Sequence, residues 1–451
     1  MATLVAAMWQ GAAAAAFGAV MVALVARRVR WGLVVLVLGL AAAWWATHSW
    51  EQAERPQLGA FHGWAVVAGD ARPVGAGTEL VLTIEGQRFE VLAYGPLGRR
   101  IASRTVGEPL EVDGVRRPLR GPFARRAHVR HIVGRFELHA LGAVGTASPL
   151  ARSATAVRSR LRGAAEQAMP GTDAALFSGL VIGDDAREPA TMVAAFRTAG
   201  LSHLTAVSGQ NVGFVLAVAA LGVRRLRPWW RWTATIGVII WFVVLTRVEP
   251  SVVRAGVMAG WSATAFVLGR VISPVRSLVA TVAVLAVIDP LLVWSVAFWL
   301  SVCATAGVCV VGPWLQRRLI GPRWVVDPLA VTLGAQVGVL LPSWLVFHRL
   351  SALGVAANLL AVPVGGFVML YGIPAGIAAT VVPRLVGTVI MLPATVGTRW
   401  VAAVADLVAR FEPHGAVAAV CWIGQWVAVS VLVVWQGRRT GWATPRTSVE
   451  R

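Results

Sequence analysis

Apolar segments of membrane-spanning length recur along this chain, and they restrict its fold more than any other feature. The hydrocarbon core of a bilayer is about 30 Å thick, so a helix needs roughly 20 mostly apolar residues to cross it. We expect such segments at 3–26 and 31–48, and then near 203–223, 233–247, 252–269, 277–289, 292–313, 328–347, 352–382, 385–411 and 415–436. The sequence therefore predicts a polytopic α-helical membrane protein with about eleven membrane helices, some of them broken.

Composition excludes several classes of function. Hydrophobic residues make up 57% of the chain and charged residues only 14%, whereas about a quarter of a soluble domain is charged. All 41 basic residues are arginine. Without lysine the chain has neither a P-loop nor a pyridoxal Schiff base, so we do not expect it to drive transport with ATP by itself. The three cysteines lie in apolar runs without a CxxC pair, and we expect no cofactor and no metal.

A polar block with short alternating stretches interrupts the apolar pattern between residues 50 and 149. The stretches 64–67, 79–85, 87–94, 109–112 and 131–141 predict about five β-strands of a small barrel or sandwich. Its later half is rich in arginine, at Arg116, Arg117, Arg120, Arg125, Arg126, Arg130 and Arg135. These arginines indicate either a face that binds DNA phosphates or a solvated surface beside anionic lipid headgroups.

Charge and hydrophobic patterning together divide the chain into five parts. We expect an N-terminal transmembrane hairpin at 1–49, an extracytoplasmic β domain at 50–149, an amphipathic interfacial linker helix at 150–175, a polytopic channel domain at 176–436 and a basic cytoplasmic tail at 437–451. The linker helix is predicted from Arg152, Arg158, Arg160 and Arg162, which alternate with apolar residues. A cleavable signal peptide is rejected, because the first charge follows the first apolar run.

Arginines in the short loops predict the orientation in the cell membrane. If the β domain is outside, the outside loops contain only Arg247 and Arg349, and the other loop arginines face the cytoplasm. The N-terminus is then outside and the C-terminus cytoplasmic. Segments 233–247 and 277–289 are too short to cross alone, which indicates broken or re-entrant helices at a transport site; local thinning of the bilayer is the alternative.

Polar residues crowd the segment that leads into the first helix of the predicted channel domain. Because isolated charge is costly in a membrane, we expect these residues to form pairs or line water, at Asp184, Asp185, Arg197, His203, Ser208, Gln210 and Asn211. Arg254 is predicted to contact phosphate in a pore, with snorkelling to the interface as the alternative. Gln336 and Asn358 are assigned either to the pore or to hydrogen bonds between helices. His203 and Ser208 lack an orienting carboxylate and a GxSxG turn, so we predict no catalytic site.

The segment FRTAGLSHLTAVSGQNVG at 196–213 resembles the signature of the ComEC family of competence proteins. The resemblance continues through EPSVVRAG at 249–256, FWLS at 298–301, AQVG at 335–338 and ANLLAVP at 357–363, and it covers roughly residues 163–435. The β block is similar to the extracytoplasmic domain of that family, which is usually described as OB-like. The resemblance implies an inner-membrane channel that takes up single-stranded DNA. It further implies an external DNA receptor, a separate nuclease and a cytoplasmic motor ATPase as partners.

Two departures from the family pattern qualify this prediction. Many members carry a metallo-β-lactamase-type domain, whereas this sequence has no HxHxDH cluster, and we expect no nuclease activity. Asn211 stands where the family often has histidine, which removes a group that titrates near neutral pH. A secondary transporter for a smaller anionic solute remains the alternative function. A structural scaffold would leave the polar segment at 184–211 unexplained.

Overall fold

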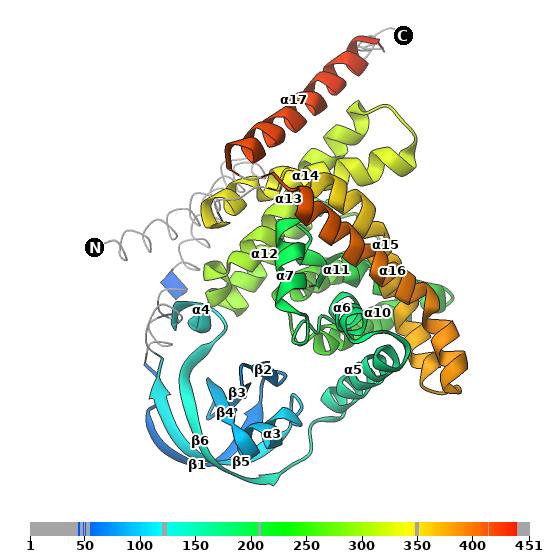
Figure 1. Cartoon of the computed structure of the whole chain (residues 1–451). Helices are drawn as coiled ribbons and strands as arrows, with labels where there is room; N and C mark the ends of the chain where they lie inside the picture. The colour runs from blue at the N-terminus through cyan, green and yellow to red at the C-terminus, as the bar shows by residue number, and fades with distance from the viewer. Residues whose placement is uncertain are drawn as a thin grey trace.

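The computed structural model describes residues 44, 45, 48, 50, 55–119, 124–205, 209–347, 351–413 and 415–439. Within these residues the chain forms a sheet domain and a larger helical part (Figure 1). The predicted N-terminal hairpin and basic tail lie almost entirely outside the described residues. A mostly helical protein with an N-terminal sheet domain is the fold class that the sequence predicted.

The sheet domain contains six strands and two short helices. They are β1 (Gly59–Val67), β2 (Arg72–Val74), β3 (Gly77–Ile84), β4 (Gln87–Tyr94), α3 (Gly95–Ala102), β5 (Pro109–Pro118), α4 (Ala124–His128) and β6 (Ile132–Val144). Each of the five predicted strands is present, and β2 is a short addition. Alternating side chains on β3 and β4 build the core, where Leu80, Leu82 and Phe89 are almost completely buried.

The strands follow the order β1–β5–β6–β4–β3–β2. β4 and β6 are parallel, whereas the other pairs are antiparallel. β1 also pairs with β3 over a short stretch, Val66 with Thr83 and Val67 with Leu82. The hairpin between β3 and β4 turns at Glu85 and Gly86, which both have positive φ as this tight turn requires. These pairings form one six-stranded sheet, so the predicted barrel is not found in the described part of the chain, and the OB-like class is not confirmed.

Helices make up the rest of the described chain. They are α5 (Pro149–Ala168), α6 (Gly171–Ile182), α7 (Ala190–Thr198), α8 (Ser202–Thr205), α9 (Gly209–Val223), α10 (Pro228–Leu245), α11 (Pro250–Val267), α12 (Pro274–Ile288), the 3₁₀ helix η1 (Pro290–Trp294), α13 (Val296–Arg318), α14 (Arg323–Phe347), α15 (Gly354–Ala379), α16 (Arg384–Phe411) and α17 (Gly415–Arg439). Prolines begin several of them, because the missing N–H and fixed φ of proline suit the first turn of a helix.

Helices α9 to α17 correspond, in order, to the predicted apolar segments after residue 200. In the described part of the chain, α10 and α13 to α16 are long and apolar enough to cross a membrane, while α6, α9, α12 and residues 420–431 of α17 are apolar but shorter. The count of eleven spans is therefore not confirmed. Segment 233–247 was wrongly judged too short, because its helix already begins at Pro228. The other short segment is indeed short, since α12 has 15 residues and is followed by η1.

Helix α5 packs one face against the other helices and exposes the opposite face, which includes Arg152 and Arg160. Its apolar side contacts α6, α10, α15 and α16, and Leu161 is buried beside Phe177 and Val401 in the largest core cluster. Two of the arginines predicted to lie at a membrane interface point inward instead, since Arg158 is buried and Arg162 is half-buried. Each of the two meets a carboxylate from another segment, Asp70 for Arg158 and Asp184 for Arg162. The interfacial position of the helix stays a prediction.

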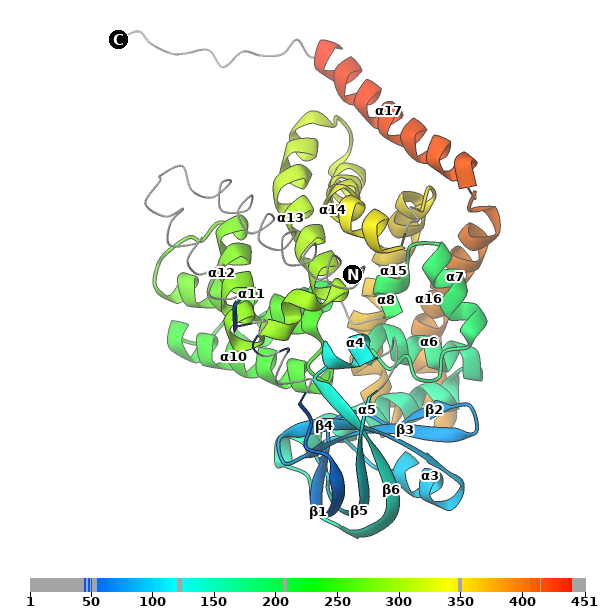
Figure 2. The same cartoon turned by 90° about the vertical axis from the view of Figure 1, so that its left-hand side faces the viewer.

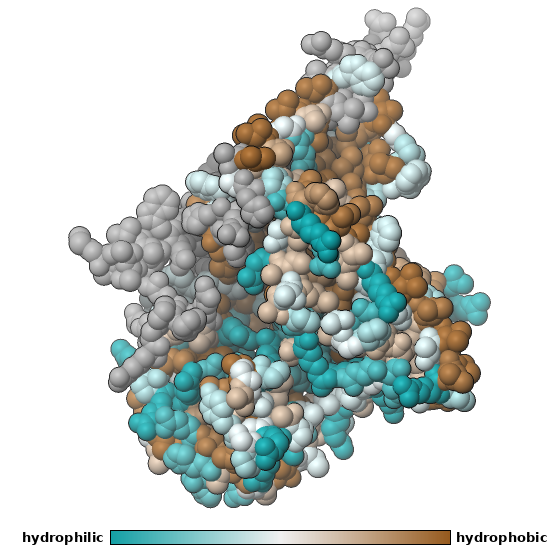
Figure 3. All heavy atoms as spheres, in the orientation of Figure 1, coloured by the Kyte–Doolittle hydropathy of each residue, from teal (hydrophilic) through white to brown (hydrophobic). Residues whose placement is uncertain are grey.

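Surface character differs between the two parts. Hydrophobic residues gather over the helices, whereas hydrophilic ones gather on the sheet domain and along its border with the helices (Figure 3). Large apolar side chains such as Leu221, Val271 and Leu385 are exposed on the helical part. A soluble surface seldom shows so much exposed apolar area, so these faces fit contact with lipid. Figure 2 shows the sheet domain below the helices, with α10 to α12 on one side and α6, α7 and α16 on the other.

Candidate functional site

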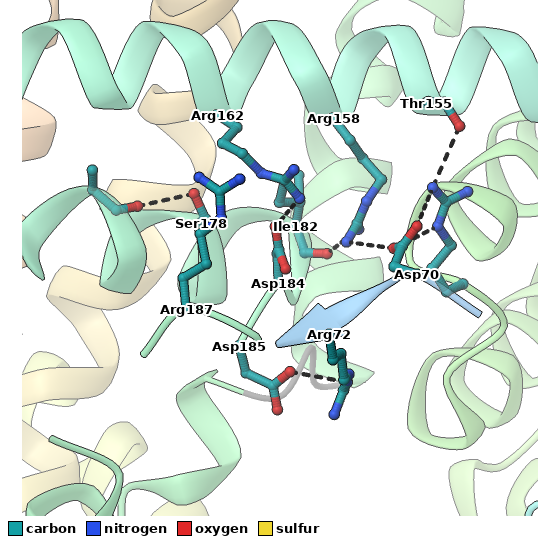
Figure 4. Close-up of polar contacts among 12 residues, drawn as sticks. Asp70, Arg72, Thr155, Arg158, Arg162, Ser178, Ile182, Asp184, Asp185 and Arg187 are labelled. Carbon is teal, nitrogen blue, oxygen red and sulfur yellow. Dashed lines mark hydrogen bonds and ion pairs between the residues drawn. The ribbon is translucent and has the colours of Figure 1, made fainter. Parts of the chain in front are cut away.

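A layer of ion pairs joins the sheet domain to the helices. The carboxylates come from the loop before β2 and the loop after α6, and the arginines come from β2, α5 and the loop after α10 (Figure 4). Helix α5 projects Arg158 and Arg162 from one face, because residues four apart lie one above the other on a helix.

Asp70 is held by two arginines from different helical segments. Arg247 donates from Nε and Nη2 to its two carboxylate oxygens, at 2.9 and 2.8 Å, and Arg158 Nη2 lies 3.3 Å from Oδ2. Burial alone would raise the pKa of Asp70, but the hydrogen bond from Arg247 and the positive charges of Arg158 and Arg247 outweigh it and lower that pKa. Asp70 therefore remains a carboxylate in this arginine pair.

Arg158 also connects two helix ends. Its Nη1 donates to the carbonyl oxygens of Ile182 and Leu245, at 2.6 and 3.0 Å, and these are the last residues of α6 and α10. A guanidinium at two C-termini satisfies carbonyls that lack helical partners and opposes the negative ends of both helix dipoles. The side chain of Arg158 is only 5% exposed. It both joins the ends of α6 and α10 and pairs with Asp70.

The two adjacent predicted aspartates take different partners. Asp184 is buried and paired with Arg162, and the more exposed Asp185 pairs with Arg72 of β2 at 3.0 Å. Arg197, which the sequence grouped with these aspartates, is the partner of neither in these ion pairs. It lies in the last turn of α7 with an exposed side chain.

Glu188 adds a half-buried acid beside these aspartates. Its Oε1 is buried and has no hydrogen-bond partner among the described residues. Burial, together with the charges of Asp185 and Asp184, raises the pKa of Glu188 to about 8. The pKa of Glu249, in the loop after α10, is also raised, first by burial and then by Asp185. The same layer therefore contains Glu188, with a raised pKa, and Asp70, with a lowered pKa.

The arginines of this layer are suited to recognising charge. Among the described residues no group of three or more His, Cys, Asp or Glu side chains is placed to hold a metal ion. The guanidinium groups present forked donors, which match carboxylate and phosphate oxygens.

A second polar contact lies within the helical part and unites three of the motifs singled out in the sequence. Arg254 of α11 is 5% exposed, and its Nε donates to the hydroxyl of Ser301 in α13 at 3.0 Å. Its Nη1 lies 3.4 Å from the sulfur of Met258. Its Nη2 would lie 2.9 Å from a Cβ placed on Gly209, the first residue of α9. A side chain at position 209 would therefore crowd this guanidinium, which lies close to the start of α9.

The remaining predicted pore residues are dispersed. His203 lies in α8 and Gln210 at the start of α9, both with exposed side chains, and Asn211 is half-buried. Ser208 lies outside the described residues. Gln336 in α14 and Asn358 in α15 are half-buried, and their side-chain oxygens lack hydrogen-bond partners in the described part of the chain. Their assignment to a pore stays a prediction.

The outer-domain arginines are largely engaged with acids. Arg116 pairs with Glu85 at 2.7 Å and lies over the Phe61 ring, while two more pairs form at 3.0 and 3.2 Å, Arg117 with Glu137 and Arg135 with Glu90. Arg130 is exposed. Arg120 and the side chains of Arg125 and Arg126 lie outside what the structure describes. The predicted basic face is thus partly neutralised by its own glutamates.

Several residues of the ion-pair layer were not identified from the sequence as a site. Arg158, Arg162 and Arg247 were interpreted as surface or loop charges, and Asp70 and Arg72 were not singled out. The four-residue spacing of Arg158 and Arg162 indicated a shared face. Nothing in one sequence indicated that a loop from the β domain would reach that face.

A pocket of about 400 Å³ lies between α10 and α11 and has a different character. Its lining is apolar and includes Ile239, Val243 and Gly256. Such a lining offers no charge to neutralise a phosphate, so this pocket does not extend the polar site.

Comparison with known proteins identifies the family of this chain. Residues 180–439, more than half of the chain, match the model of a family described as "Competence protein". The chain is 30% identical over 297 residues to the uncharacterized protein YcaI of Escherichia coli (strain K12), which covers 60% of this chain and 37% of that protein. It is 28% identical over 220 residues to ComE operon protein 3 of Bacillus subtilis (strain 168), which covers 46% and 27%.

Both alignments thus span well under half the length of the relative. No solved structure matches the chain.

Proposed function

This chain belongs to the competence protein family, and from that premise we propose that it forms a cell-membrane channel through which a single DNA strand passes inward during transformation. In this proposal the chain conducts the strand without cleaving it. An external receptor, a separate nuclease and a cytoplasmic motor would be the partners that receive, process and pull the DNA.

The observation that carries the proposal is the contact of Arg254 with Ser301 beside Gly209. These residues lie in three motifs that are far apart in the chain, and the matched family region contains all three. An arginine buried among apolar helices is costly unless it faces water, an acid or a passing anion. The phosphates of a DNA strand are the anions that this family's role would bring to it.

The position of the sheet domain supports the proposal that the loops after α6, α10 and α12 all lie on the outer side of the membrane. It contacts the loops after α6 and α10 through ion pairs, and His131 Nε2 lies 2.9 Å from Oδ2 of Asp289 after α12. The loop arginines predict that these three loops face the same side of the membrane, and the sheet domain contacts them all. We propose that this side is extracytoplasmic.

We also propose that the sheet domain is OB-like and receives the strand. Its support is the order β1–β5–β6–β4–β3 with one parallel pair, β4 with β6, and the short pairing of β1 with β3. OB-fold domains bind single strands through such sheets. Exposed Arg130 would contribute to this contact, whereas Arg116, Arg117 and Arg135 would first have to leave their glutamates.

Uptake of labelled DNA tests the proposal directly. Cells that lack this gene should accumulate label outside the cytoplasm, and the wild-type gene supplied in trans should restore cytoplasmic label and transformants. If uptake of a small anionic solute depends on the gene and uptake of DNA does not, the result would instead support a secondary transporter.

A further inference from the structure

The arginine pair around Asp70 has the form of an oxyanion site closed by the protein's own carboxylate. Arg247 holds both oxygens of Asp70 in a bidentate contact, and Arg158 adds a third nitrogen within 3.3 Å. A bidentate guanidinium contact recognises carboxylate and phosphate oxygens with the same geometry. Asp70 thus occupies the place that one phosphate of a nucleic acid would take.

Spare donors remain around this carboxylate. Nη1 of Arg247 and Nε of Arg162 are buried and have no hydrogen-bond partner among the described residues. The ion pairs of the layer contain four arginines and three aspartates, so one positive charge is not compensated within them. An anion with more oxygens than a carboxylate would use these donors.

The backbone beside Arg247 is strained. Arg247 and Val248 have φ values of 61° and 60°, in the left-handed region that a β-branched residue such as Val248 strongly disfavours. Thr155 on α5 accepts from Arg247 Nη2 at 3.3 Å. The contact with Asp70 and α5 therefore holds the Arg247 loop in a conformation that the local sequence does not favour.

We propose that Arg158 and Arg247 form a binding site for a phosphodiester of the incoming DNA strand, and that Asp70 occupies this site until the strand displaces it. Displacement would free the loop before β2 from the helices and open the border between the sheet domain and the bundle. The proposal deepens the proposed function and rests on it for the identity of the strand.

The location favours a nucleic acid over a lipid headgroup. The side chains of Arg158 and Arg247 are only 5% and 14% exposed, beneath the sheet domain and not on the apolar outer faces of the helices. The most accessible member of the site is Asp70, at 26%, which comes from the sheet domain. An occupant would therefore approach along the border between the two parts.

Binding of a fluorescent oligothymidine to the purified full-length protein tests the site. Asp70→Asn removes the competing carboxylate and should tighten binding about tenfold at low salt, the equivalent of one added charge-assisted contact. Asp113→Asn in β5 makes the same change in net charge and should shift affinity less than twofold, because Asp113 lies outside the site, 3.9 Å from His62. Adding Arg247→Gln to Asp70→Asn should abolish the gain. Equal gains in both single variants, or a gain that survives Arg247→Gln, would overturn the proposal.

A measurement on the wild-type protein covers the case in which Asp70→Asn does not fold. Hydrogen exchange of residues 68–76 should speed up when sodium phosphate replaces sodium chloride at equal ionic strength, because phosphate displaces Asp70. Unchanged exchange would count against the site. Exchange that speeds up with phosphatidylglycerol vesicles, and with neither phosphate nor oligothymidine, would also count against it.

The two proposals fail separately. If DNA uptake needs the gene but the binding and exchange results are negative, the site is wrong and the channel stands. If the site responds as expected but cells without the gene take up DNA normally, the channel is wrong.

Discussion

Arg254 of α11 and Ser301 of α13 form a hydrogen bond of 3.0 Å between two helices of the family region. Val253 and Val257, the neighbours of Arg254 on α11, pack with Phe298 and Val302 of α13, so the polar contact lies in apolar surroundings. An interhelical hydrogen bond between side chains in a membrane is worth about 1 kcal/mol. That modest value means that the Arg254 charge can serve conduction without being essential to the fold.

Replacing Arg254 by alanine should leave the protein inserted while sharply reducing DNA passage. The lost contacts to Ser301 and Met258 should cost about 1 kcal/mol of stability. DNA passage should fall much more, because the substitution removes the positive charge that we propose contacts the phosphates. Arg254→Lys should retain part of the passage, because lysine keeps the charge but loses the fork. Uptake of labelled DNA, normalised to the amount of protein in the membrane, measures both effects.

Arg270→Ala is the matched control for charge, since Arg270 is exposed after the end of α11. It should leave uptake unchanged. If Arg254→Ala passes DNA as well as the wild type does, Arg254 has no part in conduction.

Glu188 should make stability decline with pH. Burial and the charges of Asp185 and Asp184 raise its pKa to about 8 in the folded protein, from an ordinary value of 4.5. Between these pH values the folded state holds a proton that the unfolded state has lost, so stability decreases as pH rises through this window and levels off above about 8. Glu188→Gln mimics the protonated acid and should flatten this decline, which thermal unfolding of the detergent-solubilised protein from pH 5 to pH 9 measures.

Glu166→Gln provides the comparison for Glu188→Gln. Glu166 is 49% exposed and pairs with Arg187 in the same neighbourhood, so its substitution should leave the slope with pH unchanged. If Glu188→Gln has the wild-type slope, the buried carboxyl of Glu188 does not control this dependence.

The crossing of α13 and α14 depends on glycine. A Cβ on Gly338 would lie 2.0 Å from the carbonyl oxygen of Cys303, and one on Gly307 would lie 2.0 Å from that of Gly334. Gly334 and Gly338 form a GxxxG pair, which lets helix backbones approach closely. Gly338→Ala should therefore lower the thermal unfolding temperature, because the helices must separate.

Gly237→Ala makes the same chemical change in α10, where a Cβ would meet nothing within 4 Å. It should be neutral or stabilise by up to about 1 kcal/mol, as alanine does in a helix. Equal effects of the two substitutions would show that the α13–α14 contact is looser than the structure indicates.

Helices and strands were predictable because each has a local signature. Alternation along β3 and β4 and the apolar runs of α13 to α16 predicted these elements to within a few residues. The boundary of α10 was missed because Pro228, three tryptophans and Arg231 precede its most apolar part, and proline there begins the helix instead of preventing it.

Much of the candidate site was not predictable, since its partners come from distant segments. Arg158 and Asp70 are 88 positions apart, and Arg247 and Asp70 are 177 apart. Arginines with apolar residues between them have the same pattern whether they face lipid headgroups or buried carboxylates. Arg254 and Asp184 were predicted as site residues and are buried in polar contacts, because a charge in or beside an apolar run is informative without knowledge of its partner.

The loops predict the orientation of the chain, and reporters can measure it. The sheet domain contacts the loops after α6, α10 and α12, so a reporter at Gly107 should lie on the same side as those loops. The turn at Arg270, between α11 and α12, and the end of α17 at Arg439 should lie on the other side, because arginine in short loops favours the cytoplasm. Alkaline phosphatase should therefore be active when fused at Gly107 and inactive at Arg270 or after Arg439, with a cytoplasmic fluorescent reporter giving the reverse. Finding Gly107 and Arg439 on the same side would contradict both the arginine pattern and the outer position of the sheet domain.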